Sequence, residues 1–176
     1  MSETRRAVVF ADHGQFYLQD VEAHDQEMRS GGAMDPDRAP AGWTHEAVHV
    51  HRIGVEPHSI SVGTARSDFV ETSLELHETP PPELPQAEHI VEADVQIPTG
   101  ELSIYGCSED PGPEHRVNIS AGRYRVRVSY VPSDPPEVDG NPDEPGDYFR
   151  YPVEIWPATQ PAALVVVRQG PSPWAG

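Results

Sequence analysis

Apolar and polar side chains alternate with a two-residue period along most of the chain after residue 58, a pattern typical of β-strands. In residues 89–97, Val91, Ala93, Val95 and Ile97 fall on one face, and polar side chains fall on the other. Similar runs occupy residues 7–10, 15–21, 60–65, 69–77, 101–106, 117–130, 147–156 and 162–168. The runs are short and bounded by turn residues, so the pattern predicts about eight to ten strands.

Proline and glycine divide the chain into these short segments. With 20 prolines and 14 glycines in 176 residues, long helices are disfavoured because proline breaks a helix interior. Residues 24–42 have the composition of a loop, and so does the acidic loop, residues 133–147. One short helix is expected near residues 44–49, where Thr44 is a good N-cap.

These elements predict an all-β protein, built as a single antiparallel β-sandwich of a jelly-roll-like type. A chain of 176 residues suits one domain. We expect this domain to span residues 1–156, followed by a Pro-rich C-terminal tail, 157–176, which could add one strand at 162–168. Pro152 falls inside the run 147–156 and predicts a sheet edge or a bulge there, because proline cannot donate to a ladder.

The chain is strongly acidic, with 29 Asp and Glu against 12 basic residues, all of them arginine, and a net charge of −17. This charge disfavours nucleic acid and anionic membranes as partners and favours a basic protein. The alternative is that the acidity only keeps the protein soluble. If there is a basic partner, the expected contacts are Asp139, Asp143 and Glu144 in the acidic loop, with Trp174 in the terminal segment available as an exposed anchor.

Features that would direct the chain out of the cytoplasm are lacking in the sequence. There is one cysteine, Cys107, so no disulfide can form within the chain. No apolar run reaches 18 residues, and the N-terminus has no apolar stretch of signal-peptide length. We therefore expect a cytoplasmic protein.

Residues 43–51 read WTHEAVHVH and contain H-E-x-x-H at His45, Glu46 and His49. On a long helix, this spacing places two histidines on one face to bind zinc, while the glutamate acts on the bound water. Here alternation resumes within the motif, and no G-x-x-H supplies a third ligand of the metzincin type. Two interpretations remain: a zinc-dependent hydrolase, or a His-rich surface turn leading into a strand, which we favour.

A second group of polar residues lies on one strand. Arg123, Arg125 and Arg127 share a face, which indicates either an anion contact or pairing with acids such as Glu154 or Asp147 on a neighbouring strand. We favour the pairing.

Other candidate residues cluster around the first strands. Asp12, His13 and Asp20 flank them, and an Asp–His pair could take part in acid–base chemistry. Cys107 follows a strand end, where a lone cysteine is more often a small buried hydrophobe than a nucleophile. No nucleophile motif of the G-x-S-x-G type is present.

Several stretches together resemble the competence protein J family. They are DHGQFYLQD (12–20), GWTHEAV (42–48), HSISVGTA (58–65), EADVQIPTGELSIYG (92–106) and VNISAGRYRVRVSYV (117–131). The resemblance covers roughly residues 8–156 and includes no catalytic motif. It implies a compact β-sandwich that is not an enzyme, in a family whose named member inhibits a DNA-entry nuclease.

The sequence hypothesis is therefore a non-catalytic acidic binding protein, an inhibitor or immunity-type protein of a basic partner such as a nuclease. It needs no cofactor. The alternatives are a zinc-dependent hydrolase that uses the motif at 45–49 and a sandwich that binds a small molecule or a sugar between its loops.

Overall fold

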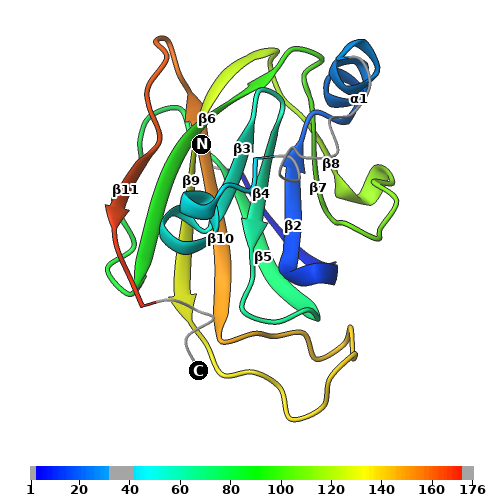
Figure 1. Ribbon diagram of the computed structural model, residues 1–176, viewed down its shortest axis with the longest axis vertical. Helices are drawn as coiled ribbons and strands as arrows, with labels where there is room; N and C mark the ends of the chain where they lie inside the picture. The colour runs from blue at the N-terminus through cyan, green and yellow to red at the C-terminus, as the bar shows by residue number, and fades with distance from the viewer. Residues whose placement is uncertain (1–2, 32–41, 172–176) are drawn as a thin grey trace.

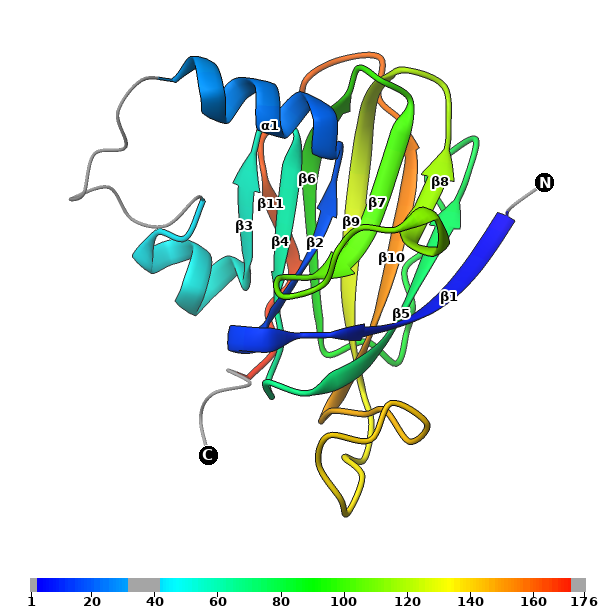
Figure 2. The same cartoon turned by 90° about the vertical axis from the view of Figure 1, so that its right-hand side faces the viewer.

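The computed structural model describes residues 3–31 and 42–171, which form two β-sheets packed face to face (Figures 1 and 2). The larger sheet has six strands in the order β1-β5-β10-β9-β6-β11. Their bounds are Glu3–Phe10 (β1), Phe69–Leu76 (β5), Phe149–Pro157 (β10), Gly122–Pro132 (β9), His89–Ile97 (β6) and Val165–Arg168 (β11).

The smaller sheet has five strands in the order β3-β4-β2-β7-β8 and covers one face of the larger sheet. Their bounds are Ile53–Glu56 (β3), Ser59–Gly63 (β4), Gln15–Gln19 (β2), Glu101–Gly106 (β7) and Arg116–Asn118 (β8). The expected all-β class and two-sheet architecture are confirmed.

The larger sheet is mixed, which corrects the expectation of a purely antiparallel sandwich. Strand β10 pairs with β5 in parallel, whereas the other strand pairs in both sheets are antiparallel. Alternation along a strand reports which face is buried and carries no information on the direction of the neighbouring strand, so this pairing could not be read from the sequence.

Pro152 lies in the central strand β10, so the expectation of a sheet edge is wrong. The ladder between β10 and β9 has no pairs at Tyr151 and Pro152, and it continues on both sides in the same register. The proline therefore interrupts one ladder locally without forming the bulge that would shift its register.

The core lies between the two sheets and is built from the inward faces that the alternation predicts. Val91, Ala93, Val95 and Ile97 on β6 are at most 1% exposed. The inward rows of β9 and β10 are likewise buried; they are Tyr124, Val126, Val128 and Tyr130 on β9, and Phe149, Tyr151, Val153 and Ile155 on β10. Period-2 patterning thus identified the core faces of the central strands correctly.

Helix α1 spans Val21–Ser30, where the sequence indicated a loop, so the expectation for residues 24–30 is wrong. Asp20 caps it by accepting a hydrogen bond from Ala23 N at 3.1 Å. Ala23 is also the only buried residue of α1, which the structure describes in full. The helix has almost no apolar stripe to reveal it in the sequence.

A helical turn is present close to residues 44–49, although it differs in type from the one expected. Thr44 acts as predicted, since its Oγ1 accepts from Ala47 N at 3.1 Å. The following segment, η2 (Ala47–His51), is a π-helix. Two short 3₁₀ turns complete the elements, η1 (Asp12–Gly14) and η3 (Pro113–His115).

Part of the C-terminal segment joins the larger sheet. Strand β11 lies within the predicted stretch 162–168 and pairs antiparallel with β6. The division between a sandwich domain at 1–156 and a tail at 157–176 stays a prediction, and Trp174 lies outside the described residues. No helix in the described parts of the chain has the length and apolar character needed to cross a bilayer.

Candidate functional site

The H-E-x-x-H motif lies on the surface at the start of η2. The rings of His45 and His49 are close, with centroids 4.4 Å apart, as expected of residues one helical turn apart. Glu46 faces His51, with Oε1 3.7 Å from Nε2. Among the described residues, no third ligand atom gathers with His45 or His49. The two histidines are therefore a pair on an exposed turn, and metal binding there stays a prediction.

The acidic loop projects from the end of the molecule opposite α1, between β9 and β10 (Figures 1 and 2). It contacts the segment before β5. Asp139 forms an ion pair with Arg66. Gly140 N donates to both carboxylate oxygens of Asp68, at 3.0 and 3.2 Å. The loop is therefore held near its tip.

The base of the loop is held by a buried carboxylate. Asp147 is fully buried, and its Oδ2 accepts from the Tyr151 hydroxyl and from Ala65 N at 2.9 Å. Burial raises the pKa of Asp147, and the hydrogen bonds that it accepts oppose this shift. Its hydrogen bonds are with Tyr151, Tyr148 and the segment before β5, so Asp147 is not the partner of the β9 arginines that the sequence suggested as one possibility.

The outer surface of the loop combines negative charge with apolar side chains. Asp139, Asp143 and Glu144 are exposed, as the sequence predicted. Beside them, Val138 is 63% exposed and the adjoining Tyr148 is 54% exposed. Tyrosine is enriched in protein interfaces because it offers a large apolar body and a polar tip. The loop and its C-terminal flank thus present both exposed carboxylates and two exposed apolar side chains.

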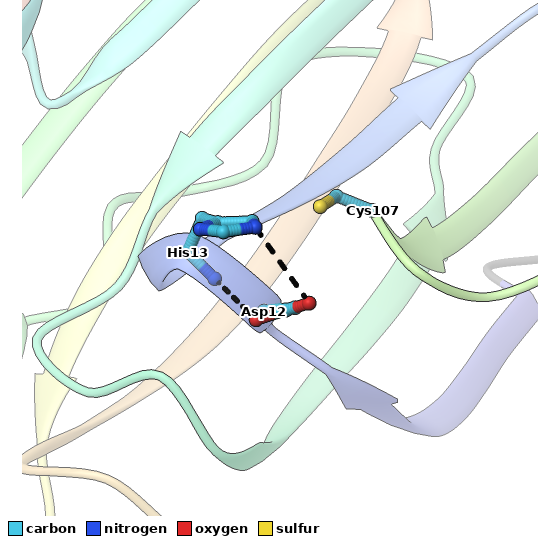
Figure 3. A group of neighbouring side chains, drawn as sticks. All are labelled: Asp12, His13 and Cys107. Atoms are coloured by element: carbon cyan, nitrogen blue, oxygen red, sulfur yellow. Dashed lines mark hydrogen bonds and ion pairs between the residues drawn. The ribbon is translucent and has the colours of Figure 1, made fainter.

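A second candidate site lies where β1 and β7 end, and it includes residues that the sequence did not connect. Figure 3 shows Asp12 and His13 on η1 facing Cys107, which follows β7. The three ligand atoms lie within 4.8 Å of one another, and His13 Nε2 is 3.8 Å from Asp12 Oδ2. His13 has a left-handed backbone, with φ of 55°. Asp20, which flanks the same strands, is instead a buried cap of α1.

A glycine and a glutamate hold the end of β7 close to the end of β1. A Cβ at Gly106 would collide with the carbonyl oxygen of Phe10, so a glycine is needed for the close approach of β1. Glu109 then clamps both strands, since its carboxylate accepts from Phe10 N at 3.2 Å and from Gly106 N at 2.6 Å. Cys107 follows directly and is partly exposed.

The arrangement of Asp12, His13 and Cys107 differs from a nucleophilic triad. In a triad, the histidine bonds the nucleophile through one ring nitrogen and the carboxylate through the other. Here the nitrogen that faces Asp12 also points toward the sulfur (Figure 3). The Ser108 hydroxyl donates to Asp12 and is the main cause of its lowered pKa. The cluster therefore resembles a set of exposed metal donors more than an activated thiol.

The arginines of β9 form ion pairs across the outward face of the larger sheet. Arg125 contacts Glu92 at 3.2 Å and Asp94 at 2.9 Å. Arg127 contacts Glu92 at 2.9 Å and Glu154 at 3.5 Å. The predicted pairing with Glu154 is thus present, and these two arginines are structural cations rather than an anion-binding stripe.

Comparisons with known proteins identify the fold. No family model matches the chain, and no curated protein matches it by sequence. The crystal structure of ComJ from Bacillus subtilis, an inhibitor of the DNA degrading activity of NucA, is similar with a TM-score of 0.59 and 12% identity; the match covers 90% of this chain and 99% of ComJ. The crocagin biosynthetic gene J product has a TM-score of 0.57 and 16% identity, with 89% and 98% covered. The chain therefore has a ComJ-like fold, in agreement with the family resemblance of its sequence.

Proposed function

We propose that this protein is a non-catalytic, cytoplasmic inhibitor or immunity-type protein that binds a basic partner, such as a nuclease, through the acidic loop. The observation that supports the proposal most is the ComJ-like fold, because ComJ inhibits a nuclease and the similarity covers almost the whole of both chains. Identities of 12% and 16% mean that the partner itself must be found by experiment.

The charge of the molecule suits such a partner. A net charge of −17 accelerates the encounter with a basic protein, and the exposed carboxylates Asp139, Asp143 and Glu144 then fix its orientation. The contacts of Asp139 and Gly140 with residues 66–68 hold the loop before binding. A preformed loop loses less conformational entropy when it binds, so more of the interaction free energy is available for affinity.

The exposed Tyr148 supplies the apolar anchor that a purely electrostatic contact lacks. Hot spots of protein interfaces are enriched in tyrosine and lie inside a rim of polar residues. Trp174, the other anchor expected from the sequence, lies outside the described residues, and its contact with a partner stays a prediction.

The proposal is tested with a purified basic nuclease encoded beside this protein, by measuring DNA degradation at increasing inhibitor concentration. We expect inhibition, and we expect the triple variant Asp139→Asn, Asp143→Asn, Glu144→Gln to weaken it about tenfold or more, chiefly through slower association. Tyr148→Ala should weaken it through faster dissociation.

A matched control removes an equal number of negative charges from α1, at the opposite end of the molecule (Figure 1). Its substitutions are Glu22→Gln, Asp25→Asn and Glu27→Gln. This variant should inhibit nearly as well as the unmodified protein. Equal losses in both triple variants would mean that only total charge matters, and no inhibition by the unmodified protein would reject the nuclease as partner.

A further inference from the structure

The outward face of the larger sheet carries a row of charged side chains in direct register across four strands. Glu75 on β5 is paired with Glu154 on β10, Glu154 with Arg127 on β9, and Arg127 with Glu92 on β6. Two of these neighbours, Glu75 and Glu154, have the same charge. Like charges directly opposite one another destabilise a sheet unless a cation lies between them.

The arginines of the row do not compensate all of its negative charge. Four carboxylates lie side by side at the centre of this face, and two guanidinium groups form the ion pairs with three of them. The fourth, Glu75, is the neighbour of Glu154 and forms no ion pair with an arginine among the described residues. The carboxylates are Glu75, Glu92, Asp94 and Glu154, and the cations are Arg125 and Arg127. Glu154 shares Arg127 with Glu92, and its side chain is only 4% exposed.

The excess charge is concentrated around His77, which follows β5. Its Nε2 lies 3.5 Å from Glu75 Oε2 and 3.7 Å from Glu154 Oε1. These separations are too long for good hydrogen bonds. Among the described residues, none forms a hydrogen bond with this buried nitrogen. A buried polar atom without a partner calls for an explanation, such as a bound ion.

The spacing of the three groups matches the edges of a metal polyhedron. With zinc–ligand distances of about 2.0–2.2 Å, neighbouring ligand atoms of a tetrahedral site lie about 3.3–3.6 Å apart. The two distances from His77 Nε2 are close to this value, and all three ligand atoms lie within 4.8 Å of one another. Small side-chain rotations would close the site. The other oxygen of Glu154 stays with Arg127.

We propose that Glu75, His77 and Glu154 bind one divalent transition-metal ion of the zinc class. One imidazole and two carboxylates suit zinc, whereas magnesium and calcium prefer oxygen ligands alone. The ion offsets the like charges of Glu75 and Glu154 and gives the His77 nitrogen a partner. The side chain of Glu75 is 31% exposed, so the ion can enter from solvent and keep a water molecule as its fourth ligand. The site is separate from the acidic loop, and the proposal does not depend on the partner of the protein.

The competing explanation is a protonated His77 that pairs with both carboxylates without a metal. Two other places could also capture an ion, namely the Asp12, His13 and Cys107 cluster and the exposed pair His45 and His49. The experiment must separate all of these from the proposed site.

The test uses the full chain, prepared without an affinity tag, stripped of metal, and titrated with Co²⁺ and with Zn²⁺ against a chromophoric chelator. We expect one equivalent to bind, with visible absorption of tetrahedral Co²⁺ and no near-ultraviolet sulfur-to-cobalt band. His77→Gln should weaken binding about 100-fold or more, because even the loss of a residue that only supports a ligand costs about 10–100-fold. Glu75→Gln should weaken it about tenfold or more.

The matched control is His115→Gln, since His115 Nε2 lies 3.6 Å from a single carboxylate oxygen, that of Glu114. This variant should bind the ion as the unmodified protein does. A sulfur-to-cobalt band, or binding lost in Cys107→Ser but kept in His77→Gln, would assign the ion to Cys107 instead. Binding lost only in His45→Gln would assign it to η2, and no binding at all would favour the protonated histidine. Each of these outcomes overturns the proposal. If one variant fails to fold, the lack of a sulfur-to-cobalt band still excludes Cys107, and the other of His77→Gln and Glu75→Gln still tests the proposed site.

Discussion

His89, at the start of β6, is fully buried and has a backbone partner for each ring nitrogen. Its Nε2 lies 3.0 Å from the carbonyl oxygen of His51, and its Nδ1 accepts from Gly170 N at 3.3 Å. This pattern requires a neutral ring with its proton on Nε2. Burial is the main cause that lowers the pKa of His89 from 6.5 to about 4, and the nearby charge of Arg52 acts in the same direction.

This shift predicts a loss of stability in acid. Between about pH 6.5 and pH 4, the unfolded chain binds a proton at His89 that the folded chain does not, so the free energy of unfolding falls as the pH falls. The contribution reaches about 3 kcal/mol near pH 4. His89→Gln cannot titrate, so the stability difference between the two proteins should shrink on acidification. Urea denaturation of both proteins at about pH 7, 5.5 and 4 measures this difference in the free energy of unfolding.

The control for His89 is His13→Gln, because the side chain of His13 is 77% exposed. The free energy of unfolding of this variant should change with pH as that of the unmodified protein does. If His89→Gln loses stability in acid as steeply as the unmodified protein does, His89 does not hold a depressed pKa and the acid sensitivity comes from other groups.

At the scale of elements, the two faces of the central strand β9 have different roles: one packs in the core, and the other forms ion pairs. Its inward side chains lie in the core, and its outward Arg125 and Arg127 are nearly buried, with 9% and 7% of their side chains exposed. Arg127 also donates to the Pro81 carbonyl oxygen at 2.8 Å and lies over the Trp156 ring at 5.1 Å. It therefore joins β6, β10 and the Pro-rich connection before β6.

Arg127→Met tests this role. The substitution keeps much of the apolar stem but leaves the buried Glu154 without its guanidinium partner and Glu92 with Arg125 alone. Breaking a buried pair from one side costs about 3–5 kcal/mol. Arg123→Met on the same face of β9, where the side chain is less buried, should cost less than about 1 kcal/mol. Equal urea midpoints for the two variants would show that the charge row of β9 does not stabilise the sheet.

Some elements could be predicted from the sequence and others could not, for physical reasons. Alternation located β6, β9 and β10 because each buries one face in the core. Helix α1 was missed because it buries only Ala23 within its described length. The parallel pairing of β10 with β5 depends on the course of the whole chain, which local patterns do not encode.

The candidate sites likewise divide into features set by local sequence and features set by long-range pairing of strands. The exposed carboxylates of the acidic loop could be predicted because composition alone places such residues at the surface. Glu75 on β5 and His77 directly after it are two residues apart and could have been recognised as neighbours on one face. Their contact with Glu154 needs the β5–β10 register, and the approach of Cys107 to His13 needs the close ends of β1 and β7. Contacts between residues that are far apart in the chain are therefore the part of the sites that could not be predicted from the sequence.

At the scale of the whole molecule, the net charge acts on stability as well as on binding. With 29 acidic and 12 basic residues, the folded chain concentrates 17 excess negative charges in a smaller volume than the unfolded chain does. Self-repulsion of this kind destabilises the compact state. Arg125 and Arg127 are already used in pairs within the sheet, so they compensate carboxylates there rather than at the surface.

Salt should therefore stabilise the protein at neutral pH. Raising NaCl from about 10 mM to 150 mM shortens the screening length from about 30 Å to 8 Å, which weakens long-range repulsion while leaving buried pairs almost unscreened. We expect the Tm at pH 7 to rise by a few degrees, measured by circular dichroism with a chelator present so that bound metal does not contribute. Near the sequence pI of about 4.7, the net charge vanishes and the rise should disappear. A Tm that falls with salt at pH 7 would mean that exposed ion pairs outweigh the net repulsion, and a rise of the same size at both pH values would mean that salt acts through hydrophobic burial.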